Sequence, residues 1–310
     1  MAETMATRQA YGKTLIELGE KYPQLVVMDA DLSKSTMTAE FGKTYPDRFF
    51  NMGIAEQNLY GAAAGLALSG KIVCASTFAM FATGRAFEII RNSIGYTRAN
   101  VKICATHAGI TVGEDGASHQ TFEDIALMRT IPGMTVINPS DGVSAKKLLE
   151  QAVAMEGPCY VRLGRAKVPV FYEDSDQLTL GKGNLVKDGK DITIVATGIM
   201  VSEAMAAAEK LKEDGIDARI IDIHTIKPID EEILIKAAQE TGAIVTAEEH
   251  SIIGGLGSAV AEVIVKNCPV KMAMVGQKDT YGESGKPDEL KKKYGMTAED
   301  IEVAVKTLIG

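Results

Sequence analysis

Chemically active side chains are concentrated in two short stretches of this sequence. In NMGIAEQN, residues 51–58, a single carboxylate, Glu56, precedes a run of small residues, YGAAAGLALSG. In THAGITVGEDGASHQ, residues 106–120, two of the chain's four histidines lie in one polar segment together with two acids. Carboxyl and imidazole groups transfer protons near neutral pH, so both stretches are candidates for acid–base chemistry.

Glu56 also has a purely structural explanation. An acid in the first turn of a helix is stabilised by the helix macrodipole, by a few tenths to about 1 kcal/mol. A carboxyl group in apolar surroundings, in contrast, has a raised pKa and can share or donate a proton near neutral pH. The position of Glu56 is compatible with both interpretations.

The segment 106–120 follows VKICAT, a run typical of a buried strand. Ligands of open parallel sheets bind beyond the carboxyl ends of the strands, so this loop is well placed for a site. Gly109, Gly113 and Gly116 allow its backbone to turn sharply and approach a ligand. A solvated, charged loop is the alternative. A zinc site lacks an HExxH or Cys/His pattern, and a serine hydrolase lacks GxSxG.

The composition is that of a globular protein, and the length of 310 residues predicts about two domains. A net charge of −8 argues against nucleic acid or an anionic membrane as partner, but it allows a small anionic substrate. The four cysteines show no CxxC spacing, so we expect reduced thiols in a cytoplasmic protein. We find no apolar segment typical of a secretory signal or a membrane span.

Short apolar runs alternate with helical patterns in the first half of the chain. The predicted strands are 25–30, 71–76, 101–106, 134–139 and 159–163. The predicted helices lie near 5–21, 55–69, 84–98, 122–130 and 141–155. The strands are rich in Val and Ile without polar alternation, which predicts a mainly parallel sheet covered by helices on both faces.

A turn-rich connection with room for a short strand occupies residues 168–191, and the α/β pattern then restarts. Strands are predicted at 192–197, 218–223, 243–248 and 270–275, with helices at 202–214, at 230–241 and after Gly255. We therefore expect two doubly wound α/β domains, residues 1–172 and a smaller domain in residues 173–310.

Two features of the second domain have unremarkable explanations. GGLG (254–257) could bind phosphate at a helix start, but it lacks the dinucleotide fingerprint and the P-loop lysine, so we favour tight-turn glycines. EEH (248–250) has no further His or Cys nearby, so we favour an interface or solvated role over a metal site.

Four stretches together resemble a known family. NMGIAEQN, STFAMF (76–81), HAGITVGEDGASHQ and IPGMTVINPSD (131–141) are similar to the pyrimidine-binding domain of transketolases, and the second domain resembles the transketolase C-terminal domain. The resemblance covers nearly the whole chain. GIAEQN is shared by several thiamine diphosphate enzymes, whereas HxxxxxGEDGxxHQ is much more specific to transketolases.

The resemblance implies that this chain binds the aminopyrimidine end of thiamine diphosphate. In the resemblance, Glu56 forms a hydrogen bond with a nitrogen of the aminopyrimidine ring. This bond shifts the ring to its imino form, whose exocyclic nitrogen removes the proton from C2 of the thiazolium ring. Phe78 and Phe81 match aromatic residues that pack on the ring, and Asp31 resembles an acid near the cofactor. Gly84 stands where many transketolases have an aromatic residue, so stacking on that side is weaker or comes from another residue.

For the substrate, the resemblance places His107 and His119 at the bound sugar and Asp115 at a sugar hydroxyl. Histidines can donate to the oxyanion that forms during addition, so both are expected to be catalytic together with Glu56.

The resemblance also places Arg8, Ser35 and Arg165 around a terminal phosphate, and a guanidinium fork suits that group. Arg8 is equally explained as a surface charge. Arg162 lies on the same predicted strand as Arg165 and could exchange roles with it.

The motif that holds the diphosphate in this family, GDG followed some tens of residues later by Asn, is missing from the sequence; the nearest string is EDG (114–116). The resemblance is therefore to the C-terminal subunit of a split transketolase. We expect an N-terminal subunit to carry the diphosphate-binding domain and Mg²⁺ or Ca²⁺, in an α2β2 assembly, with no metal ligands in this chain. The implied reaction transfers a two-carbon ketol unit from a ketose phosphate to an aldose phosphate.

Three alternatives remain at the level of sequence. The β subunit of a 2-oxoacid dehydrogenase E1 shares the domain order, AEQ and EEHSIIGGLGSAV, but it gives no reason for GEDGxxHQ. A deoxyxylulose-phosphate synthase is usually one chain. A non-catalytic partner subunit would not need the set Glu56, His107, Asp115 and His119.

Overall fold

Strands and helices alternate along most of the chain, as the sequence predicts. The computed structural model describes residues 3–310. The strands are β1 (Thr4–Met5), β2 (Leu25–Asp29), β3 (Phe49–Asn51), β4 (Ile72–Ser76), β5 (Val101–Ala105), β6 (Thr135–Ile137), β7 (Cys159–Arg162), β8 (Val168–Pro169), β9 (Asn184–Lys187), β10 (Ile192–Ala196), β11 (Ala218–Asp222), β12 (Thr225–Lys227), β13 (Ala243–Ser251) and β14 (Lys271–Gln277). The α-helices are α1 (Thr7–Lys21), α2 (Ser33–Thr36), α3 (Ala39–Thr44), α4 (Glu56–Leu68), α5 (Phe87–Ile89), α6 (Asp124–Thr130), α7 (Gly142–Ala154), α8 (Met200–Glu213), α9 (Glu231–Thr241), α10 (Leu256–Asn267), α11 (Pro287–Lys293) and α12 (Ala298–Ile309). Short 3₁₀-helices are η1 (Pro46–Arg48) and η4 (Ile110–Asp115), and π-helices are η2 (Phe81–Arg85) and η3 (Ile90–Tyr96).

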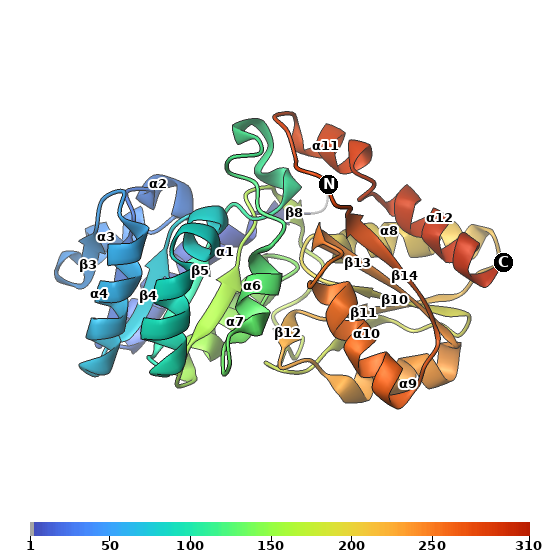
Figure 1. Cartoon of the computed structure of the whole chain (residues 1–310), viewed down its shortest axis with the longest axis horizontal. Helices are drawn as coiled ribbons and strands as arrows, with labels where there is room; N and C mark the ends of the chain where they lie inside the picture. Colours follow the sequence, from blue (N-terminus) through green and yellow to red (C-terminus); the bar gives the residue numbers. More distant parts are fainter. Residues whose placement is uncertain (1–2) are drawn as a thin grey trace.

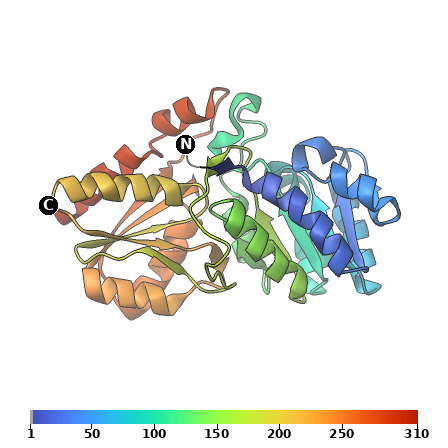
Figure 2. The same ribbon diagram turned by 180° about the vertical axis from the view of Figure 1, so that it is seen from behind.

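The first domain is built on a seven-stranded sheet with the order β12-β6-β7-β5-β4-β2-β3. All of its strand pairs are parallel except the pair of β12 with β6. Helices α1 and α7 cover one face, where Leu15 and Leu149 pack against Cys74 and Val161. Helices α4, α6 and η3 cover the other face (Figures 1 and 2). The strands are buried on both sides, which explains their uninterrupted apolar runs.

The second domain has a five-stranded sheet with the order β14-β13-β10-β11-β9, in which only β9 is antiparallel to its neighbour. Helices α9 and α10 lie on one face and α8 and α12 on the other, as Figure 1 shows. The predicted fold class, two doubly wound α/β domains with mainly parallel sheets, is therefore confirmed.

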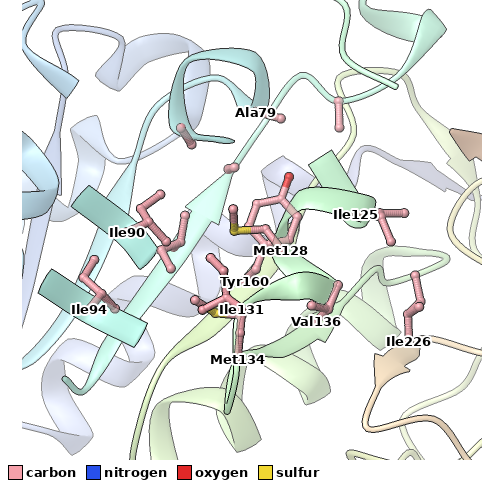
Figure 3. Close-up of a cluster of buried hydrophobic side chains, with 14 of the residues drawn as sticks. Ala79, Ile90, Ile94, Ile125, Met128, Ile131, Met134, Val136, Tyr160 and Ile226 are labelled. Carbon is pink, nitrogen blue, oxygen red and sulfur yellow. The ribbon is translucent and has the colours of Figure 1, made fainter. Parts of the chain in front are cut away.

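The buried cluster on the α4 side of the first sheet extends to the second half of the chain. Ile90 and Ile94 of η3 and Met128 of α6 lie in this cluster with Tyr160 of β7 (Figure 3). Ile226 of β12 belongs to the same cluster, although β12 comes after the connection at residues 168–191. The expected division between residues 172 and 173 stays a prediction.

The segment expected as one helix near 84–98 is instead two π-helices joined by the short α5. The connection contains two short strands, β8 and β9, where one was expected. Cys74, Cys104 and Cys159 are buried, and all four cysteines are free thiols, as predicted. Within residues 3–310 no helix combines the length and the apolar character needed to cross a bilayer.

Candidate active site

The residues singled out in the sequence follow the carboxyl ends of neighbouring parallel strands. They lie after β2 (Asp31, Ser35), β3 (Glu56), β4 (Phe78, Phe81), β5 (His107, Asp115, His119) and β7 (Arg165), while Arg8 lies in the first turn of α1. In open α/β sheets this edge is where ligands bind.

Glu56 is the first residue of α4 and is only 2% exposed. Its Oε2 accepts a hydrogen bond from Arg85 Nη1 over 2.9 Å. The helix start accounts for part of this placement because the macrodipole favours an acid there. The ion pair shows that the surroundings of Glu56 are not purely apolar, in contrast to the expectation from its sequence neighbours. Burial of a charged group this completely requires such a partner.

Aromatic rings form a continuous cluster that reaches Arg85, the partner of Glu56. Phe78 and Phe81 are stacked with centroids 6.0 Å apart, and Phe78 stacks on the His107 ring at 3.9 Å. His119 and Phe81 form a T-shaped pair with ring centroids 5.3 Å apart. An isolated bridge between Phe78 and Thr106 extends the pairing of β4 and β5 and brings the two loops together. The structure thus places both predicted phenylalanines and both predicted histidines in one site.

His107 is held in a constrained, neutral state. Its φ is +58°, a left-handed value that is uncommon for a residue other than glycine and often marks a functional site. Its Nδ1 lies 2.8 Å from Thr106 Oγ1. Burial, together with the charges of Arg8 and Arg165, lowers the pKa of His107 to about 3. A neutral imidazole remains able to donate one hydrogen bond to a ligand.

The second domain supports the loop that carries the two histidines. Glu249 Oε1 accepts a hydrogen bond from Thr111 N over 2.7 Å, and Gln120 Nε2 donates to Glu283 O over 3.0 Å. Gly109 has φ +78°, and a Cβ there would overlap the Glu249 carboxylate. The glycine is therefore needed for the backbone to approach the second domain.

The EEH stretch is an internal interface and not a solvated segment. Glu248, Glu249 and His250 are at most 2% exposed. Glu248 accepts hydrogen bonds from the backbone N–H groups of Leu256 and Gly257 over 2.6 and 2.8 Å. These amides start α10, so the GGLG turn already holds a carboxylate where a phosphate would otherwise bind.

The structure separates the roles of the two arginines near β7. Arg162 is buried, and its Nε lies 2.7 Å from Asp124 Oδ2. Arg165 is partly exposed, with Nη1 2.9 Å from Glu114 Oε2 and a further hydrogen bond to Val112 O. Only Arg165 is therefore available to an incoming anion.

Arg8 completes the cationic side of the site. Its Nη1 donates to the carbonyl of Ser35 over 2.6 Å. Burial and the charge of nearby Arg165 lower the pKa of Arg8, which indicates that the two guanidinium groups share one region. The alternative that Arg8 is an ordinary surface charge is therefore disfavoured.

Asp31 and Asp115 lie at the border of the cluster. Asp31 is exposed with φ +65°, and its Oδ1 accepts a hydrogen bond from Asn51 Nδ2 over 3.0 Å. Asp115 is the exposed last residue of η4. Their assignments to the cofactor and to a sugar hydroxyl stay predictions.

Arg85 is the side chain of the candidate site that the sequence reasoning missed. It contacts Glu56, and its Cζ lies 4.8 Å from the centroid of the Phe81 ring. The signal was present beside it, because Gly84 departs from the aromatic pattern of the family and leaves Phe81 to be covered by another residue.

A thiamine diphosphate pyrimidine fits the residues present. A planar nitrogen heterocycle needs a carboxyl group for a ring nitrogen and an aromatic surface for its face. Glu56 supplies the first, with no hydrogen bond to its Oε1 from any residue in 3–310, and Phe81 supplies the second. The part of the chain that the structure describes contains no group of three or more His, Cys, Asp or Glu arranged to hold a metal ion.

Comparisons with known proteins agree with this fit. The chain matches "Transketolase, pyrimidine binding domain" over residues 3–170 and "Transketolase, C-terminal domain" over residues 181–301. The "Putative transketolase C-terminal section" of Methanocaldococcus jannaschii is 57% identical over 95% of this chain and 93% of its own length. The "6-deoxy-6-sulfo-D-fructose transketolase subunit SqwH" of Clostridium sp. strain MSTE9 is 44% identical over 95% of this chain and 91% of its own length.

A solved structure, "Split gene transketolase, inactive beta4 tetramer", shares 55% sequence identity with the chain. It superposes with a TM-score of 0.93 and covers 98% of both chains. Both domain matches, the relatives of similar length and this structure lead to one conclusion: the chain belongs to the transketolase family, of the type that consists of a pyrimidine-binding domain followed by the C-terminal domain.

Proposed function

We propose that this chain is the C-terminal subunit of a thiamine diphosphate-dependent transketolase and transfers a two-carbon ketol unit from a ketose phosphate to an aldose phosphate. The observation that carries the proposal is the buried carboxylate of Glu56, which Arg85 connects to the aromatic and histidine cluster. When bound, thiamine diphosphate supplies the carbon nucleophile and the electron sink for breaking a carbon–carbon bond. Glu56 binds the pyrimidine by a hydrogen bond and exchanges a proton with it.

His107 and His119 act on the sugar. His107 is neutral, so it donates a hydrogen bond to a developing oxyanion without carrying a full charge, and its Nδ1 is engaged by Thr106. His119, whose Nδ1 lies 2.9 Å from Ser118 Oγ, faces the aromatic cluster from the same loop. Asp115 at the end of η4 selects among sugar hydroxyls.

Arg8 and Arg165, with Ser35, bind the charged end group of the sugar. Burial and, after it, the charge of nearby Arg165 lower the pKa of Arg8, and two neighbouring guanidinium groups favour an anionic ligand. The Clostridium relative is named for 6-deoxy-6-sulfo-D-fructose, a sugar with a charged end group, which supports an anionic terminus as the feature that is recognised.

The proposed holoenzyme contains a second polypeptide. An N-terminal transketolase subunit supplies the diphosphate-binding domain and Mg²⁺ or Ca²⁺, in an α2β2 assembly. The similar solved structure is described as an inactive β4 tetramer of a split-gene transketolase, which supports the proposal that this chain alone self-associates without activity.

The experiment is reconstitution. The isolated chain, the N-terminal partner and their mixture are assayed for ketol transfer with thiamine diphosphate and Mg²⁺, and cofactor binding is followed by calorimetry. Activity and tight binding are expected only in the mixture. Turnover by this chain alone contradicts the proposal, and turnover of a 2-oxoacid in place of ketose phosphate favours the dehydrogenase alternative.

A further inference from the structure

We propose that Arg85 is a positioning residue for Glu56: it holds one oxygen of the carboxyl group and leaves the other available to the aminopyrimidine. This inference rests on the proposed function and adds a residue to that site. The side chain of Glu56 is 3% exposed, whereas that of Arg85 is 50% exposed. The ion pair therefore joins a buried acid to a cation at the border with solvent.

The contact between the two residues uses only half of the carboxyl group. Arg85 Nη1 donates to Glu56 Oε2 over 2.9 Å, and within residues 3–310 no hydrogen bond reaches Oε1. An ionised carboxyl oxygen accepts about two hydrogen bonds, so Oε1 is the atom left for a ligand. Because a charged donor holds Oε2, the orientation of the carboxyl group is restrained before the ligand arrives.

Arg85 also contacts an aromatic ring of the cluster. Its Cζ lies 4.8 Å from the centroid of the Phe81 ring, a distance at which a planar guanidinium is attracted to the ring face. Phe81 and Arg85 both belong to the π-helix η2, a rare helical form that is frequent at functional sites. Gly84 has no side chain in this turn, and a Cβ there would overlap the terminal methyl of Met80.

The guanidinium of Arg85 therefore contacts both the Phe81 ring and the Glu56 carboxyl group. Lysine would keep the charge but lose the planar fork, so lysine is not a conservative replacement here.

The test uses three variants in the reconstituted complex. Arg85→Met removes the positive charge and the planar guanidinium group but keeps an unbranched side chain. Arg85→Lys keeps the positive charge without the guanidinium group. Arg91→Met, six residues further along in η3 and exposed, is the matched control. Two quantities are measured: the affinity for thiamine diphosphate with Mg²⁺ by calorimetry, and hydrogen–deuterium exchange at cofactor C2. Near-ultraviolet circular dichroism checks that each variant is folded.

Loss of one charge-assisted hydrogen bond predicts that Arg85→Met weakens cofactor affinity by roughly 10-fold and slows C2 exchange by roughly 10- to 100-fold. Arg85→Lys should fall between Arg85→Met and the wild type, and KM for both sugars should not change. Unchanged exchange in Arg85→Met overturns the inference. Tighter cofactor binding in Arg85→Met also overturns it, because Arg85 would then occupy the place of the pyrimidine.

The proposed function and this inference fail in different ways. If the wild-type complex exchanges C2 but transfers no ketol unit, the assigned reaction is wrong, while the exchange data still decide the role of Arg85. If the wild type transfers ketol units and Arg85→Met matches Arg91→Met in every readout, only the role of Arg85 is wrong.

Discussion

The Nε atom of Arg162 lies 2.7 Å from Oδ2 of Asp124, and neither side chain is more than 4% exposed. Tyr160 donates to the same Asp124 oxygen over 2.6 Å, and Arg162 also donates to the carbonyl of Glu249 over 2.8 Å. Because Glu249 lies in β13 of the second sheet, this buried group joins the two domains. Arg165, in contrast, is partly exposed and pairs with Glu114 near the surface.

The two arginines should therefore give opposite phenotypes. Arg162→Met leaves a buried carboxylate unpaired, which is expected to lower the free energy of unfolding by about 3–5 kcal/mol. Arg165→Met should change it by less than about 1 kcal/mol, because the Arg165–Glu114 pair is near the surface. Arg165→Met should instead raise KM for phosphorylated sugars. Urea unfolding and steady-state kinetics of the reconstituted complex measure both effects, and a raised KM in a fully stable Arg162→Met protein would reverse the assignment.

Glu56→Gln tests the proposed proton exchange between the Glu56 carboxyl group and the pyrimidine of the cofactor. The amide keeps the shape and part of the hydrogen bonding but cannot exchange a proton, so turnover should fall by roughly 10²–10⁴-fold. The thermal midpoint should change little because Arg85 can donate to the amide oxygen. Exchange at cofactor C2 in the reconstituted complex reports the step directly, and wild-type exchange in Glu56→Gln contradicts the assigned role.

The histidine loop should act on the sugar and not on the cofactor. His107→Ala removes a neutral hydrogen-bond donor, and loss of such a donor to an oxyanion costs roughly 10²–10³-fold in kcat. His119→Ala should also lower sugar turnover, while Asp115→Ala should change the preference between sugars that differ in hydroxyl stereochemistry. Calorimetry should find cofactor affinity unchanged in all three variants. Loss of cofactor affinity with unaltered sugar preference would show that the loop binds the other ligand.

Because His224 is buried, we expect the free energy of unfolding to fall in acid. Burial lowers the pKa of His224 to about 4, whereas an unfolded histidine titrates near 6.5. The unfolded chain therefore binds the proton first as the pH falls. The contribution of neutral His224 to the free energy of unfolding is complete above pH 6.5 and is lost toward pH 4. Between pH 8 and pH 5 the loss amounts to about 2 kcal/mol.

Urea unfolding of the wild type and of His224→Gln at pH 8 and pH 5 isolates this contribution. Burial raises the pKa of Asp222 to about 7, which acts in the opposite direction, but this effect is common to both proteins and cancels. The variant should lose about 2 kcal/mol less than the wild type on acidification. Equal losses in the two proteins would mean that His224 is not responsible.

The sequence was sufficient for elements whose local pattern and tertiary role agree. β2, β4 and β5 are apolar along their whole length, and the parallel sheet buries them on both faces. β12 escaped prediction because it is three residues long and is defined by its pairing with β6, a contact between distant segments. The π-helices around α5 escaped because apolar periodicity does not distinguish them from an α-helix.

The same reasoning explains what was found of the candidate site. Glu56, His107 and His119 occur in motifs, so their types and spacing identify them. The partnership of Arg85 with Glu56 spans 29 residues and depends on how η2 meets the start of α4. The choice between Arg162 and Arg165 depended on Asp124 and Glu249, which no local pattern connects to them.

The pairing of β12 with β6 connects the two halves of the chain. In sequence, β12 follows the connection at residues 168–191, yet it is an edge strand of the first sheet. Its Ile226 belongs to the apolar cluster of the first domain. A proteolytic nick in the connection would leave both pieces bound in the native state. A fragment that ended at the connection would expose the hydrogen-bonding groups of β6 and invite aggregation. The halves should accordingly melt as one cooperative unit, and biosynthesis must reach residue 227 before the first domain can finish folding.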